Sequence, residues 1–206
     1  MNRVLPLVVM ALAILAFAMF FLVIAPGVEI RAQPPSPGLK PYTAAQQRGR
    51  DHFVALGCFY CHSQQPRAGD QAPDRERGWG RASVASDYFY DNPHQLGTMR
   101  TGPDLFNEAA RSPSREWQLT HLYQPRGIHS WSIMPAFPFL FEVKDRAEPG
   151  DVVVALSPKY QVANKVVVAR PEALDLVEYI LSLDHTYPAP PTGIRDDGYN
   201  NRRGQE

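Results

Sequence analysis

The stretch Cys58-Phe59-Tyr60-Cys61-His62 is a C-x-x-C-H run, and the interpretation of the rest of the chain depends on it. Two thiols three positions apart can each add to one vinyl group of the same haem, and this spacing is typical of covalent c-type haem attachment. The histidine directly after the second thiol is then held at the iron, where an imidazole is a favoured ligand. The run therefore predicts one haem c attached to Cys58 and Cys61, with His62 as an axial ligand.

Three other interpretations explain the run less well. A thioredoxin-like redox pair needs C-x-x-C near a strand–helix pattern but does not need the following histidine. A structural zinc site usually has four ligands, and the chain has only two cysteines, both in this run. A disulfide across two intervening residues would be strained and would close almost no loop, so it would stabilise the fold little.

The composition fits one modest domain with appendages. The 206 residues carry a formal net charge of +0, so the chain lacks the electrostatic footprint of a nucleic-acid-binding protein. A hydrophobic content of 44% is enough for a packed core, whereas the 20 prolines favour loops and turns over long helices. We expect a mainly α fold with long loops.

The N-terminal segment is uncharged and almost wholly apolar from Val4 to Val28. A hydrocarbon core of about 30 Å is crossed by about 20 helical residues, so residues 1–30 are predicted to form one transmembrane anchor. A cleaved signal peptide is the alternative, but its apolar region is normally only about 7–15 residues long. Ile30-Arg31-Ala32 is also a poor cleavage site.

The basic residues around this segment predict its orientation. Arg3 precedes the span, and no basic residue follows until Arg31, which favours a cytoplasmic N-terminus. The haem domain then lies on the periplasmic side of a bacterial inner membrane, the side on which haem c is assembled.

Beyond the anchor we expect a Pro-rich spacer at 31–42, a haem domain at 43–186 and an extended or disordered tail at 187–206. Three helices are predicted in the haem domain. The first, Thr43 to about Leu56, has a Thr43–Gln46 capping box. The others run from Pro113, with Ser112 as N-cap, to Tyr123 and from Pro171 to about Leu183.

A second iron ligand must come from later in the chain. Met134 is the best candidate because Pro135 follows it and fixes an extended loop that suits a thioether aimed at a haem. Met99 is poorer because it lies just before the turn at Thr101-Gly102-Pro103. His121 falls within a predicted helix, where a structural role is favoured over iron ligation. The remaining candidates are His52, His94, His129 and His185.

The run Arg100-Thr101-Gly102-Pro103 offers a partner for the haem-ligating histidine. Such a histidine is normally oriented by an acceptor on its other ring nitrogen, and the Pro103 carbonyl is the candidate acceptor for His62. Arg100 is a candidate for contact with a haem propionate.

The chain resembles a class I cytochrome c domain and, more closely, the membrane-anchored mono-haem subunit II of cbb3-type cytochrome c oxidases. The resemblance spans about 49–140 and keeps the family's order of motifs. The residues that carry it are Gly57–Gln64, Tyr90-Asp91-Asn92-Pro93, Arg100–Leu105, Glu116-Trp117, His121-Leu122, Pro125-Arg126 and Met134–Pro138.

This resemblance implies thioether bonds at Cys58 and Cys61 and axial ligation by His62 and Met134. In class I domains the last helix crosses the helix before the haem motif, so Gly49 and Phe53 should meet it near Tyr179.

The chain departs from the family at about 144–170, which is expected to be an insertion. Val152–Leu156 and Val166–Val168 are predicted to form a small β-hairpin there, because they are rich in β-branched residues.

The resemblance further implies an electron-transfer subunit that passes electrons toward the catalytic haem-copper subunit, with no catalytic residues of its own. A further cytochrome c subunit or a soluble cytochrome c would be the donor. The alternatives are a cytochrome c subunit of a nitric oxide reductase and a free-standing membrane-tethered shuttle.

The long segment Gln64–Arg100 is expected to dock onto the catalytic subunit. Its arginines, interleaved with aromatic residues, are Arg67, Arg75, Arg77 and Arg81.

Overall fold

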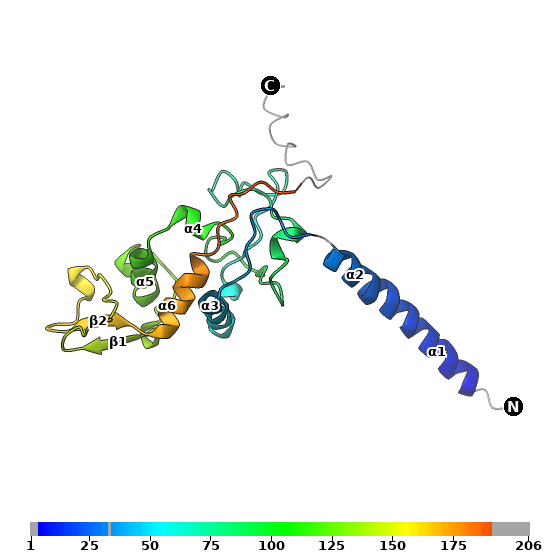
Figure 1. Cartoon of the computed structure of the whole chain (residues 1–206), viewed down its shortest axis with the longest axis horizontal. Helices are drawn as coiled ribbons and strands as arrows, with labels where there is room; N and C mark the ends of the chain where they lie inside the picture. Colours follow the sequence, from blue (N-terminus) through cyan, green and yellow to red (C-terminus); the bar gives the residue numbers. More distant parts are fainter. Residues whose placement is uncertain (1–3, 33, 191–206) are drawn as a thin grey trace, which may run out of the picture.

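The computed structural model describes residues 4–32 and 34–190. A long helical rod at the N-terminus projects from a globular part that holds all the other elements (Figure 1). Arg3, which carries the predicted orientation of the anchor, and positions 191–206 of the predicted tail lie outside the described residues.

The rod consists of α1 (Val4–Met19), a π-helical turn η1 (Phe20–Ile24) and α2 (Ala25–Ala32). Within the described part of the chain, Val4–Glu29 is the one helix long and apolar enough to cross a membrane, and none of its most apolar stretch is buried in the domain. The π turn precedes Pro26, which has no N–H to donate to the preceding turn. The predicted anchor helix is therefore present and leaves its apolar side chains free to contact lipid or another chain.

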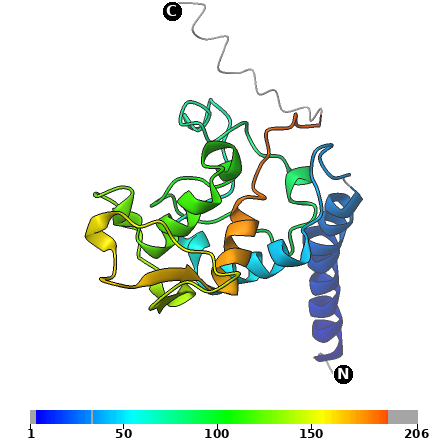
Figure 2. The same ribbon diagram turned by 60° about the vertical axis from the view of Figure 1, so that its left-hand side comes forward.

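Two helices cross at the centre of the globular part, α3 (Ala44–Ala55) and α6 (Pro171–Ile180) (Figure 2). The close crossing depends on Gly49, because a Cβ there would lie 1.8 Å from the Asp175 carbonyl oxygen. The Phe53 and Tyr179 rings pack edge to face with their centroids 5.4 Å apart. The expected meeting of Gly49 and Phe53 with the last helix near Tyr179 is confirmed.

The ends of these helices follow the sequence signals. Thr43 caps α3 in a capping box with Gln46, as predicted. Pro171 is the first residue of α6, also as predicted, but this helix ends at Ile180 rather than at Leu183.

The predicted start of the middle helix was wrong by two residues. A short helix α4 (Glu108–Arg111) precedes it, and the Ser112 N–H donates to the Glu108 carbonyl at the end of α4. The middle helix, α5 (Arg115–Tyr123), is capped instead by the Ser114 hydroxyl, which accepts from the Trp117 N–H at 3.1 Å.

The predicted pairing of 152–156 with 166–168 is present as a short antiparallel bridge, in which the Val154 N–H donates to the Val167 carbonyl, but the regular sheet uses another strand. β1 (Phe141–Lys144) pairs antiparallel with β2 (Val166–Ala169), and Phe141 lies opposite Ala169. The valine run at 152–156 makes an isolated bridge from Val153 to the other edge of β2. The β-branched signal correctly marked extended chain, but it could not identify Phe141–Lys144 as the partner strand.

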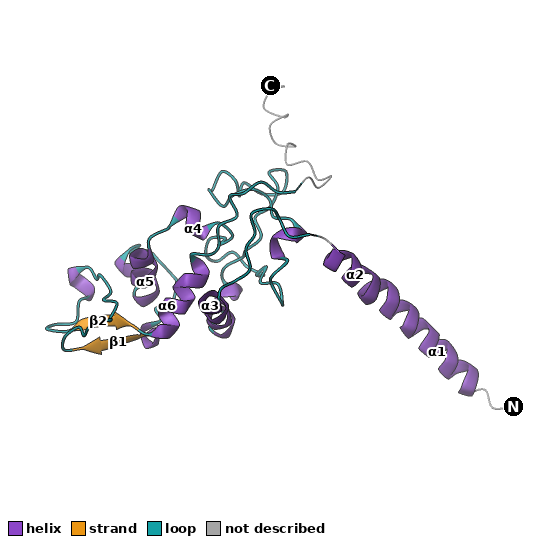
Figure 3. Ribbon diagram, in the orientation of Figure 1, coloured by secondary structure: helices purple, strands orange, loops and turns teal. Residues whose placement is uncertain are grey.

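Loops make up most of the rest of the domain (Figure 3). The Pro-rich spacer is not loose, since the Ser36 hydroxyl lies 2.7 Å from an Asp87 carboxylate oxygen in the long loop. The first residue of the predicted tail, Tyr187, is also held, because its carbonyl accepts from Arg81. Five short 3-10 turns complete the described elements: η2 (Cys58–Tyr60), η3 (Ala85–Tyr88), η4 (Pro125–Gly127), η5 (Pro138–Leu140) and η6 (Pro158–Tyr160).

Replacing Gly49 by Ala should lower the free energy of unfolding by about 1–3 kcal/mol, because α3 and α6 must separate to admit the methyl group. Gly27→Ala is the control, since a Cβ at that position meets nothing within 4 Å. Denaturant unfolding of the detergent-solubilised chain, followed by circular dichroism, measures both. Equal stability of the Gly49 variant and the wild type would contradict the packing described.

Candidate haem-binding site

A cavity of about 320 Å³ opens between the end of α3, one face of α5, α6 and the segment around Met134. Most of its wall is apolar, with Phe53 and Leu176 among the fully buried core residues. Apolar walls with a few convergent polar groups are typical of cofactor sites. Cys58, Cys61 and His62 all line this one cavity.

The haem motif is presented by the end of α3. Gly57 adopts a left-handed conformation with φ 71°, which ends the helix and turns the chain into η2. The His62 N–H then donates to the Cys58 carbonyl at 3.0 Å, so the five residues form one compact turn. Both cysteines are free thiols.

The surroundings of the cysteines do not favour the redox and zinc interpretations. The run follows a helix rather than a strand, and burial raises the pKa of the Cys58 thiol to about 11. Reactive redox cysteines have a lowered pKa. Among residues 4–32 and 34–190 no group of three or more His, Cys, Asp or Glu side chains is placed to hold a metal ion.

His62 is oriented by the turn at Gly102-Pro103. Its Nδ1 lies 2.8 Å from the Pro103 carbonyl oxygen, which is the acceptor expected from the sequence. Because a carbonyl can only accept, Nδ1 carries the proton and Nε2 keeps its lone pair. Burial lowers the pKa of this imidazole, which favours the neutral form that binds iron.

Gly102 lets the turn pack directly on the imidazole. A Cβ at this position would lie 2.4 Å from His62 Cε1 and 2.8 Å from Nδ1. The Gly102 N–H donates to the Cys61 carbonyl at 2.9 Å, which ties the turn to the motif. The absence of a side chain is therefore a steric requirement of this imidazole position.

Met134 lines the same cavity and packs against the hydrophobic core. Its backbone N–H donates to the Ser132 hydroxyl at 3.2 Å, and the Phe137 N–H donates to the Leu122 carbonyl at 3.0 Å, which ties the loop to α5. Met99 does not line the cavity and is 58% exposed. Of the histidines considered as ligands, the cavity wall includes His121 and His129 but not His52, His94 or His185.

The chain matches the family model described as cytochrome c oxidase, mono-heme subunit/FixO, over residues 2–167. The chain belongs to this family. The match covers the apolar N-terminal helix, the haem motif and Met134, and it confirms the resemblance to subunit II of cbb3-type oxidases. A comparison with curated proteins found no match.

The residues of this family member fit the one haem that the family name implies. Two free thiols, an imidazole with a free Nε2 and a thioether converge on one apolar cavity. These are the groups that a c-type haem requires.

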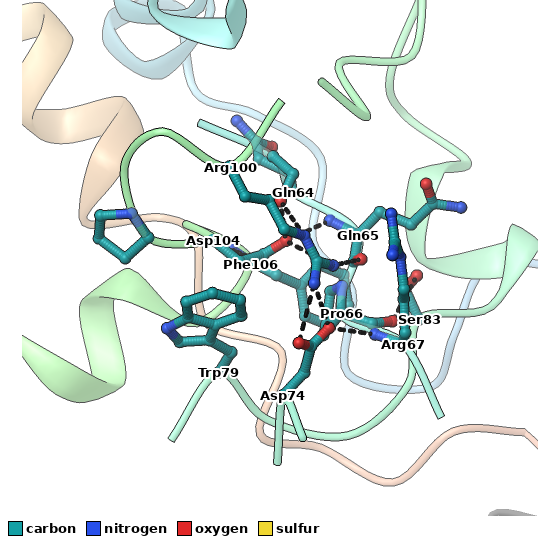
Figure 4. A network of polar contacts seen from close by, with 12 residues as sticks. Gln64, Gln65, Pro66, Arg67, Asp74, Trp79, Ser83, Arg100, Asp104 and Phe106 are labelled. Carbon is teal, nitrogen blue, oxygen red and sulfur yellow. Dashed lines mark hydrogen bonds and ion pairs between the residues drawn. The ribbon is translucent and has the colours of Figure 1, made fainter. Parts of the chain in front are cut away.

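Arg100 does not line this cavity and instead forms the centre of a polar network (Figure 4). Its guanidinium donates to the buried Asp74 carboxylate at 2.8 Å and to the Gln65 carbonyl at 2.7 Å, and it lies 5.2 Å from the centroid of the Trp79 ring. These contacts hold in place the residues that directly follow the haem motif. They give no support to a propionate contact, which stays a prediction.

The expected availability of the loop arginines is only partly met. Arg81 is bound within the chain, with two guanidinium nitrogens 2.8 and 2.7 Å from the Asp87 carboxylate oxygens. Arg67, Arg75 and Arg77 are exposed. Arg77 also lies 5.0 Å from the Trp79 ring centroid. Arg81 is therefore not available to a partner at the docking surface expected on this loop.

Several residues of the cavity wall were not predicted from the sequence, notably Glu108, Trp117 and Gln118. Glu108 is buried and is ion-paired with Arg111. The i,i+4 spacing of Trp117 and His121 places them on one face of α5 and could have indicated a shared wall. Burial, with smaller contributions from the charges of His129 and His62, lowers the pKa of His121 to about 4.

Replacing Gly102 by Ala should displace the His62 imidazole and weaken its bond to the iron. The expected result is a changed absorption spectrum and lower haem retention in the purified chain. Gly127→Ala is the control, since its Cβ would meet the Tyr160 ring at an ordinary 3.4 Å. An unchanged spectrum in the Gly102 variant would contradict the packing of this turn on His62.

Replacing Arg100 by Gln should destabilise the domain by about 1–3 kcal/mol, because the buried Asp74 carboxylate loses its closest ion pair and keeps only the Arg67 N–H and a 3.7 Å contact with Arg77. Asp74→Asn in the same background should restore part of that loss. Denaturant unfolding of the wild type, the two single variants and the double variant gives the coupling free energy between Arg100 and Asp74. Reduction potentials are recorded on the same variants. A shifted potential with unchanged stability would favour the propionate role over the structural one.

Proposed function

We propose that this chain is the membrane-anchored electron-transfer subunit of a cbb3-type oxidase and carries one covalently attached haem c. Cys58 and Cys61 form the thioether bonds, and His62 and Met134 are the axial ligands. The observation that carries the proposal is the convergence of these four side chains on one apolar cavity in a chain of the mono-haem subunit family.

The cavity supports electron transfer rather than bond-making chemistry. When bound, haem c supplies a one-electron Fe(II)/Fe(III) couple. The Pro103 carbonyl fixes the tautomer of His62, so that Nε2 is ready to bind metal without proton release. The apolar wall excludes water, and a Met ligand opposite a His favours a high reduction potential, which suits delivery to a strong oxidant.

The anchor and the long loop support membership of a larger complex. The apolar side chains of α1 are unburied within the chain, so they are available to lipid and to the transmembrane helices of a catalytic subunit. We place the haem domain on the periplasmic side of a bacterial inner membrane. A further cytochrome c subunit or a soluble cytochrome c is the proposed donor, and the catalytic haem-copper subunit is the acceptor.

Replacing Met134 by Ala should abolish the sulfur-to-iron charge-transfer band of the ferric protein and lower its reduction potential, because the thioether ligand is lost. Absorption spectroscopy and potentiometry of the purified chain measure these effects. Met99→Ala is the matched control and should change neither. Persistence of the band in the Met134 variant would show that another residue is the sixth ligand.

Purification of the native complex tests the proposed role. A tagged chain extracted in mild detergent should co-purify with a haem-copper subunit, and its haem should be oxidised when oxygen is added to the reduced complex. Recovery as a monomer would instead support a free-standing shuttle. Turnover of nitric oxide without oxygen reduction would support a nitric oxide reductase.

A further inference from the structure

Glu108 is the one acidic residue in the wall of the haem cavity among the residues that the structure describes, and no lysine or arginine joins it there. The residue is buried, with 6% of its surface exposed. A carboxylate in mostly apolar surroundings costs free energy unless it is paired, and its charge acts strongly on its neighbours because little water screens it. This carboxylate is therefore placed to act on the charge of a haem iron in the cavity.

The backbone holds Glu108 close to the haem motif. The Leu105 N–H donates to the carbonyl of Ser63, the residue after His62, at 2.8 Å. The Glu108 N–H, at the start of α4, donates in turn to the Leu105 carbonyl at 3.0 Å. Burial lowers the pKa of His62, whereas the bond to the Pro103 carbonyl and then the charge of Glu108 raise it. The negative charge of Glu108 therefore reaches the imidazole that is proposed to bind the iron.

Two donors fix this carboxylate. The Arg111 guanidinium is ion-paired with Oε2, and the Gln118 side-chain amide donates to Oε1 at 3.3 Å. Both contacts favour the ionised form of the carboxyl group. Arg111 does not line the cavity, so the ion pair turns its negative end toward the cavity. Besides the larger effect of burial, the charge of Arg111 lowers the pKa of His62 by less than the charge of Glu108 raises it, so the pair acts on this imidazole as an anion.

We propose that Glu108 lowers the reduction potential of the haem by stabilising its ferric state. The proposal rests on the proposed function, because it requires a haem c whose iron is bound by His62. Reduction by one electron from the donor cytochrome removes one positive charge from the iron, and the carboxylate attracts the more positive ferric form more strongly. A Met134 ligand favours a high potential. Glu108 acts in the opposite direction and sets the potential below the value that the two axial ligands alone would give.

The test measures reduction potentials of the haem-loaded full-length chain. Glu108→Gln keeps an acceptor for Gln118 and removes the charge, so it should raise the potential. Glu108→Asp keeps the charge and should recover part of the difference. Glu116→Gln is the control, because it removes an exposed carboxylate that does not line the cavity, and it should leave the potential unchanged. The shift in Glu108→Gln should persist at high salt, since a buried charge is little screened.

An unchanged or lowered potential in Glu108→Gln, at full haem content, overturns the role of Glu108. An equal rise in Glu108→Gln and Glu108→Asp also overturns it, because the cause would then be altered packing rather than lost charge. A wild-type chain without covalent haem shows instead that the proposed function has failed.

Arg111→Gln tests the same charge from the other side, and it serves if Glu108→Gln does not retain haem. This variant removes the positive partner and leaves the carboxylate, so it should lower the potential. An unchanged or raised potential in Arg111→Gln would overturn the proposal.

Discussion

The contact between the His62 imidazole and the Gly102-Pro103 turn is the constraint on which the site depends. One hydrogen bond of 2.8 Å sets the tautomer, and the missing side chain at Gly102 allows the turn to pack against the imidazole. The same turn is tied back to the haem motif through the Cys61 carbonyl. The nitrogen proposed to bind iron is thus positioned by the backbone, which moves less than a side-chain partner would.

The rest of the domain holds the two sides of this contact in place. The α3–α6 crossing at Gly49 fixes the helix from which the cysteines follow. The loop from 64 to 100 is held on α3 by an ion pair between Arg50 and Asp91, whose side chains are both 4% exposed. Arg100, the last residue of that loop, pairs with Asp74 near its start and donates to the Gln65 carbonyl just after the haem motif. A long proline-rich excursion can therefore support a rigid site, because buried ion pairs replace secondary structure.

Local signals in the sequence were sufficient for the motif, the capping box and the apolar N-terminal helix, whereas the helix crossing was expected from the resemblance to class I cytochrome c domains. Each of these local signals depends on residues close together in the chain. The bridge between the valine run at 152–156 and β2 was predicted, but the pairing of β1 with β2 was not, because Phe141–Lys144 carries no comparable β-branched signal and lies beside β2 only in the folded domain. The roles of Arg100 and Arg81 were also beyond prediction, since their partners Asp74 and Asp87 are identified only once the loop is folded.

If the cavity holds one haem attached through both cysteines, intact-mass analysis of the purified chain after denaturation will detect it directly. The expected mass exceeds that of the polypeptide by one haem, acidified organic solvent should not extract the haem, and neither cysteine should react with an alkylating reagent. A mass equal to that of the bare polypeptide, with two alkylated thiols and haem in the solvent, would contradict it.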